Sequence, residues 1–377
     1  MAQPAPVEQA ITHDPAYDAV APDDFAAMLA VERYGRRSAA FDAIIGATHD
    51  HFWDPYNPAY LDFAQPFDLD HDSIMPLGRF PELNCAATEH LDERQKIRLA
   101  NEIQRWNLSN ILHGEQGALS LSASLCDILL DPGAQEYAAN QTREEARHVA
   151  AFGRYVAVRW GRPHPVGEML GLFLDDIVHT PLVYKKLIGM QILLEGLAMG
   201  AFANLHAHTR DPLLQRLVQL VMTDEAFHHK FGKIWADRTL PKLSRDEHER
   251  VEDWTAEVFQ TLLFNLSSIA QRGYIYQAFG LDPTVLRESV REAFSGGRKR
   301  AMREGTNVFR VLVKTLFKAG IVTERTIHVY AAWIDTEAME AEGDAMVGDA
   351  IAAEGIEYLR EINRTRRVIG QKPALAV

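Results

Sequence analysis

The chain has 377 residues, of which 47% are hydrophobic, so it is long enough to bury the core of one large domain or of two. Its formal net charge of −13 argues against nucleic acid as the main partner, because phosphate groups repel an acidic surface. The two cysteines make neither a disulfide framework nor a thiolate metal site, and a reducing cytoplasm is the simplest expected location.

The chain divides into four parts by composition and pattern. The N-terminal stretch is polar and dotted with proline, and it lacks the basic-then-apolar order of a signal peptide. Pro55 and Pro58 forbid regular structure in the aromatic segment around Trp53. The predicted parts are a flexible arm (1–21), an N-terminal helix with an aromatic loop (22–94), a four-helix bundle (95–240) and a C-terminal helical extension packed on the bundle (241–377).

The bundle part is predicted from long helical patterns that are separated by turn signals. The first helix is expected over residues 92–130 and is stopped by Asp131-Pro132-Gly133, where Asp and Pro also suit the start of the next helix. A further long helix is expected over residues 181–208. Asp211-Pro212 then starts another, in the same way as the first Asp-Pro pair. No strand hairpin or βαβ pattern stands out, so the predicted fold class is all-α.

The C-terminal part continues the helical pattern. Ser244 and Glu247 predict a capping box for a helix that is expected to reach about Phe279. Asp282-Pro283 predicts the start of the next helix. The chain has no glycine-rich phosphate loop, so a bound nucleotide cofactor is not expected.

The most apolar stretch of the chain, residues 187–205, is predicted to be a buried helix. It contains Gln191, Glu195 and Asn204, and a carboxylate near its middle would be costly inside a lipid bilayer. We therefore expect no membrane association for this chain.

One pattern of acids and histidines occurs twice, at the same offset along the chain as the two Asp-Pro pairs. In each copy a Glu is followed at one fixed spacing by a second Glu, and three residues further on by a His. The first Glu lies 16 residues before the Asp-Pro turn and the second lies 14 after it, so the helix rises about 24 Å and returns about 21 Å. Two such hairpins packed antiparallel bring all six side chains to one level of a ferritin-like four-helix bundle. The first copy is Glu115, Glu145 and His148, and the second is Glu195, Glu225 and His228.

These six side chains predict a dinuclear metal site. Carboxylate and imidazole donors suit iron or manganese, and four carboxylates balance the charge of two divalent ions. Glu145 and Glu225 are the candidate bridges, and each His would bind one metal. Glu115 and Glu195 would be terminal ligands that are free to shift, which makes them the predicted catalytic carboxylates.

Neighbouring residues are predicted to support these ligands. Glu144 and Asp224 each precede an ExxH motif and could accept the second ring N–H of a His ligand. Arg147 could neutralise these outer acids. His229 could be an extra ligand or an outer residue of the site, and the outer role is preferred.

An apolar set of residues is predicted to lie beside the site. These residues either are ordinary core or line a cavity for the apolar part of a substrate. They are Phe152, Met199, Phe202 and Met222.

With these motifs the sequence resembles the carboxylate-bridged diiron superfamily. This group includes ribonucleotide reductase small subunits, acyl-carrier-protein desaturases, bacterial multicomponent monooxygenases and arylamine N-oxygenases. The resemblance covers about residues 95–240. It implies a cofactor of two iron ions, with Mn/Fe as an alternative, and an oxidoreductase that uses O2 to hydroxylate, N-oxygenate or desaturate a small, mostly apolar molecule. It also implies an external electron donor, either a reductase or a ferredoxin, and is compatible with a homodimer.

Three departures leave the subfamily open. Phe152 stands where most reductase small subunits carry the radical-bearing tyrosine, one turn after the first His. Met199 stands in place of the threonine of the monooxygenases, and Val221 in place of the additional histidine of the arylamine N-oxygenases. A reductase-type radical protein and a ferritin-like iron-handling protein therefore remain alternatives. The long extension after Arg238 argues against iron handling.

Overall fold

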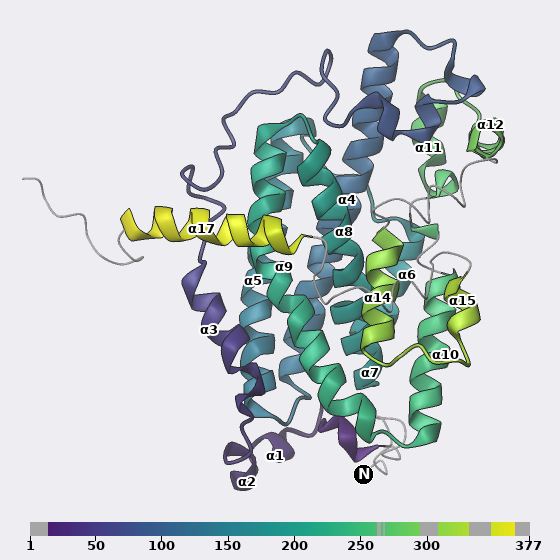
Figure 1. Ribbon diagram of the computed structural model, residues 1–377. Coiled ribbons are helices and arrows are strands. Elements are labelled where there is room, and N and C mark those ends of the chain that lie inside the picture. Colours follow the sequence, from purple (N-terminus) through teal and green to yellow (C-terminus); the bar gives the residue numbers. More distant parts are fainter. Residues whose placement is uncertain (1–13, 262–264, 267, 295–307, 332–347, 366–377) are drawn as a thin grey trace, which may run out of the picture.

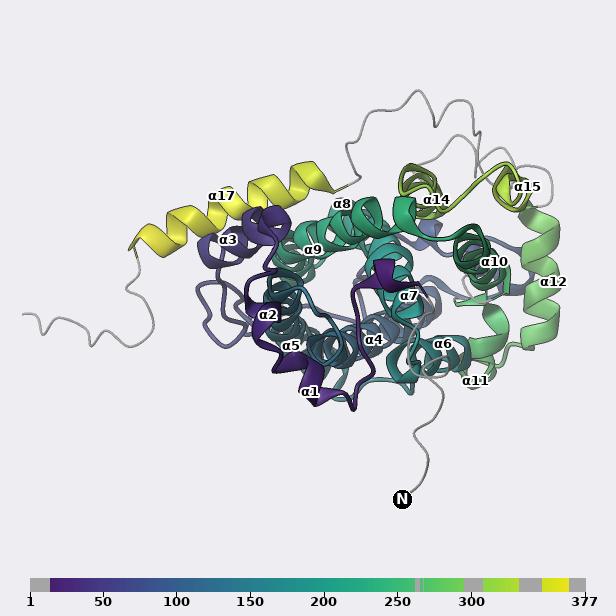
Figure 2. The same cartoon turned by 90° about the horizontal axis from the view of Figure 1, so that it is seen from below.

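The computed structural model is built from helices (Figures 1 and 2). Within the described ranges the chain forms α-helices, short 3-10 turns and one π-helix, with no β-strand. The predicted all-α class is thereby confirmed, and the fold is consistent with the predicted ferritin-like bundle. The structure describes residues 14–261, 265–266, 268–294, 308–331 and 348–365.

Two helical hairpins form the central bundle. Helix α4 packs along α5 in the first hairpin, α8 packs along α9 in the second, and α5 also contacts α9. Apolar side chains from all four helices fill the core between them. The helices are α4 (Glu93–Cys126), α5 (Pro132–Trp160), α8 (Glu195–His208) and α9 (Pro212–Thr239).

Side-chain caps fix where three of these helices, α4, α5 and α9, begin. Asp92 and Gln95 form a reciprocal capping box at the start of α4. The Asp131 carboxylate accepts a hydrogen bond from Gly133 N at 2.9 Å, and Asp211 accepts one from Leu213 N at 2.9 Å. Proline follows both caps, in the first turn of α5 and α9. Both predicted Asp-Pro helix starts are thus confirmed.

The predicted helix over residues 181–208 contains a feature that its sequence pattern does not reveal. Helix α7 (Val183–Lys186) leads into a π-helix, Leu187–Leu194, which then continues as α8. This continuous segment, Val183–His208, is long and apolar enough to cross a membrane, and its 18-residue apolar window has a mean hydropathy of 1.4. Its apolar window is 72% buried inside the protein, so it serves as a core helix.

Further helices cover the bundle on two sides. Helix α3 (Asp42–Asp50) packs on α5 and α9, and α17 (Asp349–Thr365) crosses α9 on the same side (Figures 1 and 2). Helix α6 (Glu168–His179) packs on α4, and α14 (Val308–Lys318) packs on α8. Four helices of the C-terminal part lie with α14 away from α17: α10 (Arg245–Thr261), α11 (Gly273–Ala278), α12 (Pro283–Phe294) and α15 (Ile327–Ala331).

Two predictions outside the bundle are wrong. The helix that was expected to reach Phe279 ends as α10 at Thr261, and α11 is a separate short helix. The described part of the predicted arm, residues 14–21, is packed: Tyr17 is 3% exposed and donates a hydrogen bond to Glu247. Residues 18–20 also exchange backbone hydrogen bonds with residues 128–130. Residues 1–13 of that arm lie outside the described part.

The N-terminal part was predicted to contain one helix, and the structure divides it into several short ones. Among the described residues before α4, the α-helices are the short α1 (Phe25–Met28), the short α2 (Val31–Tyr34) and α3, and the other helical elements are 3-10 turns. The aromatic segment after α3 is irregular, as predicted, but Trp53 within it is fully buried. This loop therefore enters the core and contributes to the site described next.

Candidate metal centre

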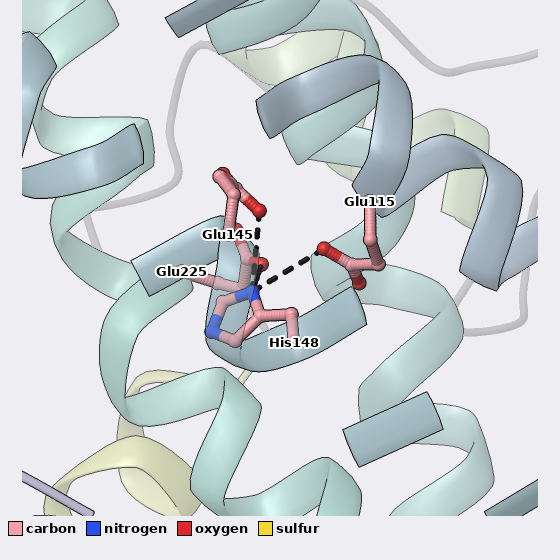
Figure 3. A group of neighbouring side chains, drawn as sticks. All are labelled: Glu115, Glu145, His148 and Glu225. Atoms are coloured by element: carbon pink, nitrogen blue, oxygen red, sulfur yellow. Dashed lines mark hydrogen bonds and ion pairs between the residues drawn. The ribbon is translucent and has the colours of Figure 1, made fainter. Parts of the chain in front are cut away.

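The two hairpins bring the six predicted ligands together in the middle of the bundle. All six side chains are buried. They form two groups, each with candidate donor atoms within 4.8 Å of one another, and Glu145 and Glu225 belong to both. The first group is Glu115, Glu145, His148 and Glu225, shown in Figure 3, and the second is Glu145, Glu195, Glu225 and His228.

The two shared carboxylates each present one oxygen to each histidine. His148 Nδ1 lies 3.2 Å from Glu145 Oε2 and 3.1 Å from Glu225 Oε1 (Figure 3). His228 Nδ1 lies 3.1 Å from Glu145 Oε1 and 3.0 Å from Glu225 Oε2. This is the arrangement that two bridging carboxylates require.

Each of the other two glutamates lies close to one histidine only. Glu115 Oε2 lies 3.3 Å from His148 Nδ1, and Glu195 Oε1 lies 3.9 Å from His228 Nδ1. Glu115 comes from α4 and Glu195 from the first turn of α8, so the two hairpins supply equivalent residues. Each half of the site therefore offers one terminal carboxylate, one imidazole and a share of both bridges.

The outer acids contact the histidines in a crossed pattern. His148 Nε2 lies 3.0 Å from Asp224 Oδ2, and His228 Nε2 lies 3.0 Å from Glu144 Oε2. Each imidazole N–H is thus paired with an acid from the other hairpin. Glu144, next to the motif of His148, contacts His228, and Asp224, next to the motif of His228, contacts His148. A carboxylate on Nε2 leaves Nδ1 of each ring as the free donor for a metal.

Asp224 is the more heavily bonded of the two outer acids. Its Oδ2 also accepts hydrogen bonds from Arg147 Nη2 at 2.7 Å and from Trp53 Nε1 at 2.9 Å. His51 Nε2 lies 3.4 Å from Oδ1. Arg147 Nη2 also lies 3.9 Å from Glu144 Oε1, so Arg147 is placed between the two outer acids that it was predicted to neutralise. Trp53 and His51 were missed, because no spacing in the sequence links the aromatic loop to α9.

A pair of buried glutamines beside the ligands was also missed. Gln141 Nε2 donates to Glu145 Oε1 at 3.1 Å and to Glu195 Oε1 at 3.3 Å. Gln191 Nε2 donates to Gln141 Oε1 at 2.8 Å and so holds that amide in place. The available signal was that each glutamine lies four residues before a ligand, on the same helix face.

Close packing of the π-helix on α9 fixes Gln191. A Cβ on Gly232 would lie 2.6 Å from Gln191 Cβ and 3.1 Å from its carbonyl oxygen, so no larger residue fits without movement. We expect Gly232→Ala to lower the free energy of unfolding by about 1–3 kcal/mol, the usual cost of overpacking a core.

Chemical denaturation of the wild type and of this variant measures that difference. Gly46→Ala in α3 is the control, because a Cβ there would meet no atom of the described residues within 4 Å. An exposed helical Gly→Ala change adds stability or leaves it unchanged. Equal stability of Gly232→Ala and the wild type would show that the π-helix contact is loose.

The charges of the six residues balance through bound protons when no metal is present. Burial raises the pKa of Glu115 to about 8, and burial together with Glu225 raises the pKa of Glu195 well above its usual value. Burial opposes protonation of His148, but Asp224 and the site glutamates outweigh it and raise its pKa. The pKa of His228 is raised in the same way, against burial, by Glu145 and Glu225.

The bridging carboxylates are the ionised members of the set. Burial works against the charge of Glu145 and Glu225, yet His228 and the other hydrogen-bond partners lower the pKa of both. The pKa of Asp224 is held well below its usual range by Arg147 and His148, again against burial. In the metal-free cluster, protons on the histidines and terminal glutamates occupy the atoms that could bind cations. The four carboxylates and two imidazoles are a donor set that fits two divalent ions.

His229 lies outside both ligand groups. It is buried on α9, hydrogen-bonds the backbone of Gln191, and burial lowers its pKa to about 4. It is therefore neutral at pH 7, and its place next to Gln191 matches the outer role that was preferred for it.

The predicted pocket residues are tightly packed. Phe152, Met199, Phe202 and Met222 are all buried in one core cluster, and the rings of Phe152 and Phe202 stack at 5.8 Å. A Cβ on Gly348 would lie 2.4 Å from the Met222 methyl group and 2.9 Å from that of Met199. Gly348, directly before α17, is thus in close contact with both methionines. The role of the four residues in a substrate pocket stays a prediction.

Comparison with known proteins adds nothing to this geometry: neither the protein-family models nor the curated proteins contain a match to the chain. The candidate metal centre therefore rests on the arrangement of the residues themselves.

Proposed function

We propose that the chain binds two divalent transition-metal ions, iron in the first place, and uses them to activate O2 for the oxidation of a small organic molecule. The observation that carries the proposal is the pair of overlapping groups that share Glu145 and Glu225. One ion would be held by Glu115 and His148 and the other by Glu195 and His228.

The donor set favours iron, with manganese as the alternative in one position. Oxygen and imidazole nitrogen donors suit these metals, whereas neither ligand group contains a thiolate. Four carboxylates and two neutral imidazoles carry four negative charges, which two divalent ions balance. A redox-active metal pair would supply the binding and reduction of O2 that protein side chains alone do not provide.

The side chains of the chain would keep that chemistry controlled. Glu144 and Asp224 hold each ligand imidazole by its Nε2–H and so fix its orientation. Burial of the whole cluster excludes bulk water. The terminal carboxylates Glu115 and Glu195 are the ligands that could move aside without breaking the bridges. A small, mostly apolar substrate and an external reductase or ferredoxin complete the proposal.

Metal analysis of protein purified without chelator tests the metal part. We expect close to two iron, or iron plus manganese, ions per chain, because both groups are complete and buried. Elemental analysis by mass spectrometry measures this directly. No metal, or a single zinc ion, would overturn the proposal.

Reaction of the iron(II)-loaded protein with O2 tests the oxidase part. We expect two irons per chain to be oxidised, and the later recovery of iron(II) to depend on an added electron donor. Candidate substrates are then screened for a product by mass spectrometry, with apolar amines, alkyl chains and arenes first. Uptake of many more than two irons per chain would instead favour iron storage.

A further inference from the structure

The two copies of the sequence pattern have the same ligands, but the residues next to those ligands differ between the copies. When the second copy is aligned on the first, Gln141 corresponds to Val221, and Gln191 corresponds to Ile111. Gly232, which admits Gln191, corresponds to Phe152. The two halves of the site thus have the same ligands and different surroundings.

Polar side chains fix the half that contains Glu195 and His228. One amide nitrogen of Gln141 bonds Oε1 of both Glu145 and Glu195, which sets the distance between these two carboxylates. Gln191 holds the amide from its other end, and the contact of the π-helix with Gly232 holds Gln191. All of these groups are fully buried or nearly so, so water does not compete for the bonds. The carboxylates of this half are ordered before a metal arrives.

The half that contains Glu115 and His148 lacks this support. Among the described residues, the hydrogen-bonding contact of the Glu115 carboxylate is with His148. The counterpart of Gln141 is the buried, apolar Val221, which has no donor to offer. Within the described part of the chain, a Cβ on Gly114, directly before Glu115, would meet nothing within 4 Å, so no described residue fills the space beside this turn of α4. Leu194 stands at the equivalent position before Glu195.

From this difference we propose that the two metal positions are unequal. The Glu195–His228 position is the tight and rigid one. The Glu115–His148 position is weaker, and Glu115 moves there to let a small exogenous ligand reach the metal. Gln141 is the positioning residue that creates the difference. This inference rests on the proposed function, since it requires that the site bind two metals.

Titration with cobalt(II), followed by visible absorption under anaerobic conditions, tests the inequality. In the wild type we expect two binding steps whose dissociation constants differ by about tenfold or more, the size of effect that outer residues have on metal affinity. Glu115→Gln should keep the tight step and lose the weak one, and Glu195→Gln should lose the tight step. The opposite assignment, or two equal steps, would overturn the inference.

A change at Gln141 tests the cause. We expect Gln141→Leu to weaken the tight step by about 10–100-fold and to leave the weak step within about threefold. Gln104→Leu is the matched control, because Gln104 is a buried glutamine of α4 whose Nε2 has no hydrogen-bond partner among the residues that the structure describes. It should change neither step. An unchanged tight step in Gln141→Leu would contradict the positioning role.

Azide is the probe for the open position. We expect azide to shift the visible bands of the protein with two cobalt ions per chain, and to leave those of the protein with one cobalt ion nearly unchanged. An equal shift in both samples would show that the tight position is open too. Absence of any cobalt binding by the wild type would instead refute the proposed function, so the two failures are distinguishable.

Discussion

Replacing Glu145 with alanine is expected to abolish binding of both metal ions, and not of one alone. The two oxygens of Glu145 face different histidines, with Oε2 3.2 Å from His148 and Oε1 3.1 Å from His228. The change therefore removes one donor from each half and the link between them. Elemental analysis of the purified variant should give less than about a tenth of the wild-type metal content, since loss of even an outer partner costs 10–100-fold in affinity.

The same variant is expected to lose stability when both proteins are metal-free. Glu145 is one of the ionised carboxylates that face the protonated rings of His148 and His228. Its loss leaves buried positive charge with less compensation, which typically costs about 3–5 kcal/mol. Chemical denaturation in the presence of chelator measures this cost.

A matched control separates the site from general effects on the helix. Glu136→Ala removes an exposed glutamate from the same helix, where it pairs with Arg37 on the surface. This change should keep the metal content and cost at most about 1 kcal/mol. Retention of one metal per chain by Glu145→Ala would mean that Glu145 is a terminal ligand and that the bridging arrangement is wrong.

The ligand set was accessible from the sequence because it depends on helix geometry alone. A fixed rise per residue and the Asp-Pro caps determine that Glu115 and Glu145 return to one level, as do Glu195 and Glu225. Ligands three residues apart on α5 and α9 share a face for the same reason. These constraints act within one hairpin, where spacing in the chain translates directly into distance.

The surroundings of the ligands depend on how the hairpins meet, which spacing does not determine. The crossed pairing of His148 with Asp224 needs the packing of α5 against α9. Trp53 reaches Asp224 from a loop that is 171 residues away in the chain. The π-helix places Gln191 next to Gln141, and no apolar periodicity distinguishes such a segment from an ordinary buried helix.

The wrong predictions have a similar origin. The sequence after Thr261 has apolar residues at helical spacing, yet the described residues 269–278 form a 3-10 helix followed by the short α11. Arg272, at the end of the 3-10 helix, and Tyr276, in α11, both bond the buried Glu82. Tyr17 lies in a proline-rich stretch that composition alone marks as an arm, but its ring stacks on Trp235 at 6.2 Å. Tertiary contacts override local composition in both places.

Metal loading at pH 7 is expected to release about four protons for each pair of ions. His148, His228, Glu115 and Glu195 hold a proton in the metal-free protein, because the pKa of each is raised, to about 8 for Glu115. A metal binds only the deprotonated form of each ligand, so all four protons leave. Titration of the metal-free protein in weak buffer with a pH indicator counts them.

The sign of the pH dependence follows from the same protons. Below about pH 8 metal affinity should rise with pH, by about a hundredfold per unit for each ion if two protons leave with it. Above pH 8 Glu115 has already lost its proton. The number released should therefore fall towards three, and the slope should flatten. Release of no protons, or an affinity that is independent of pH between 6 and 8, would mean that the four groups are already unprotonated and that the buried charges are balanced in another way.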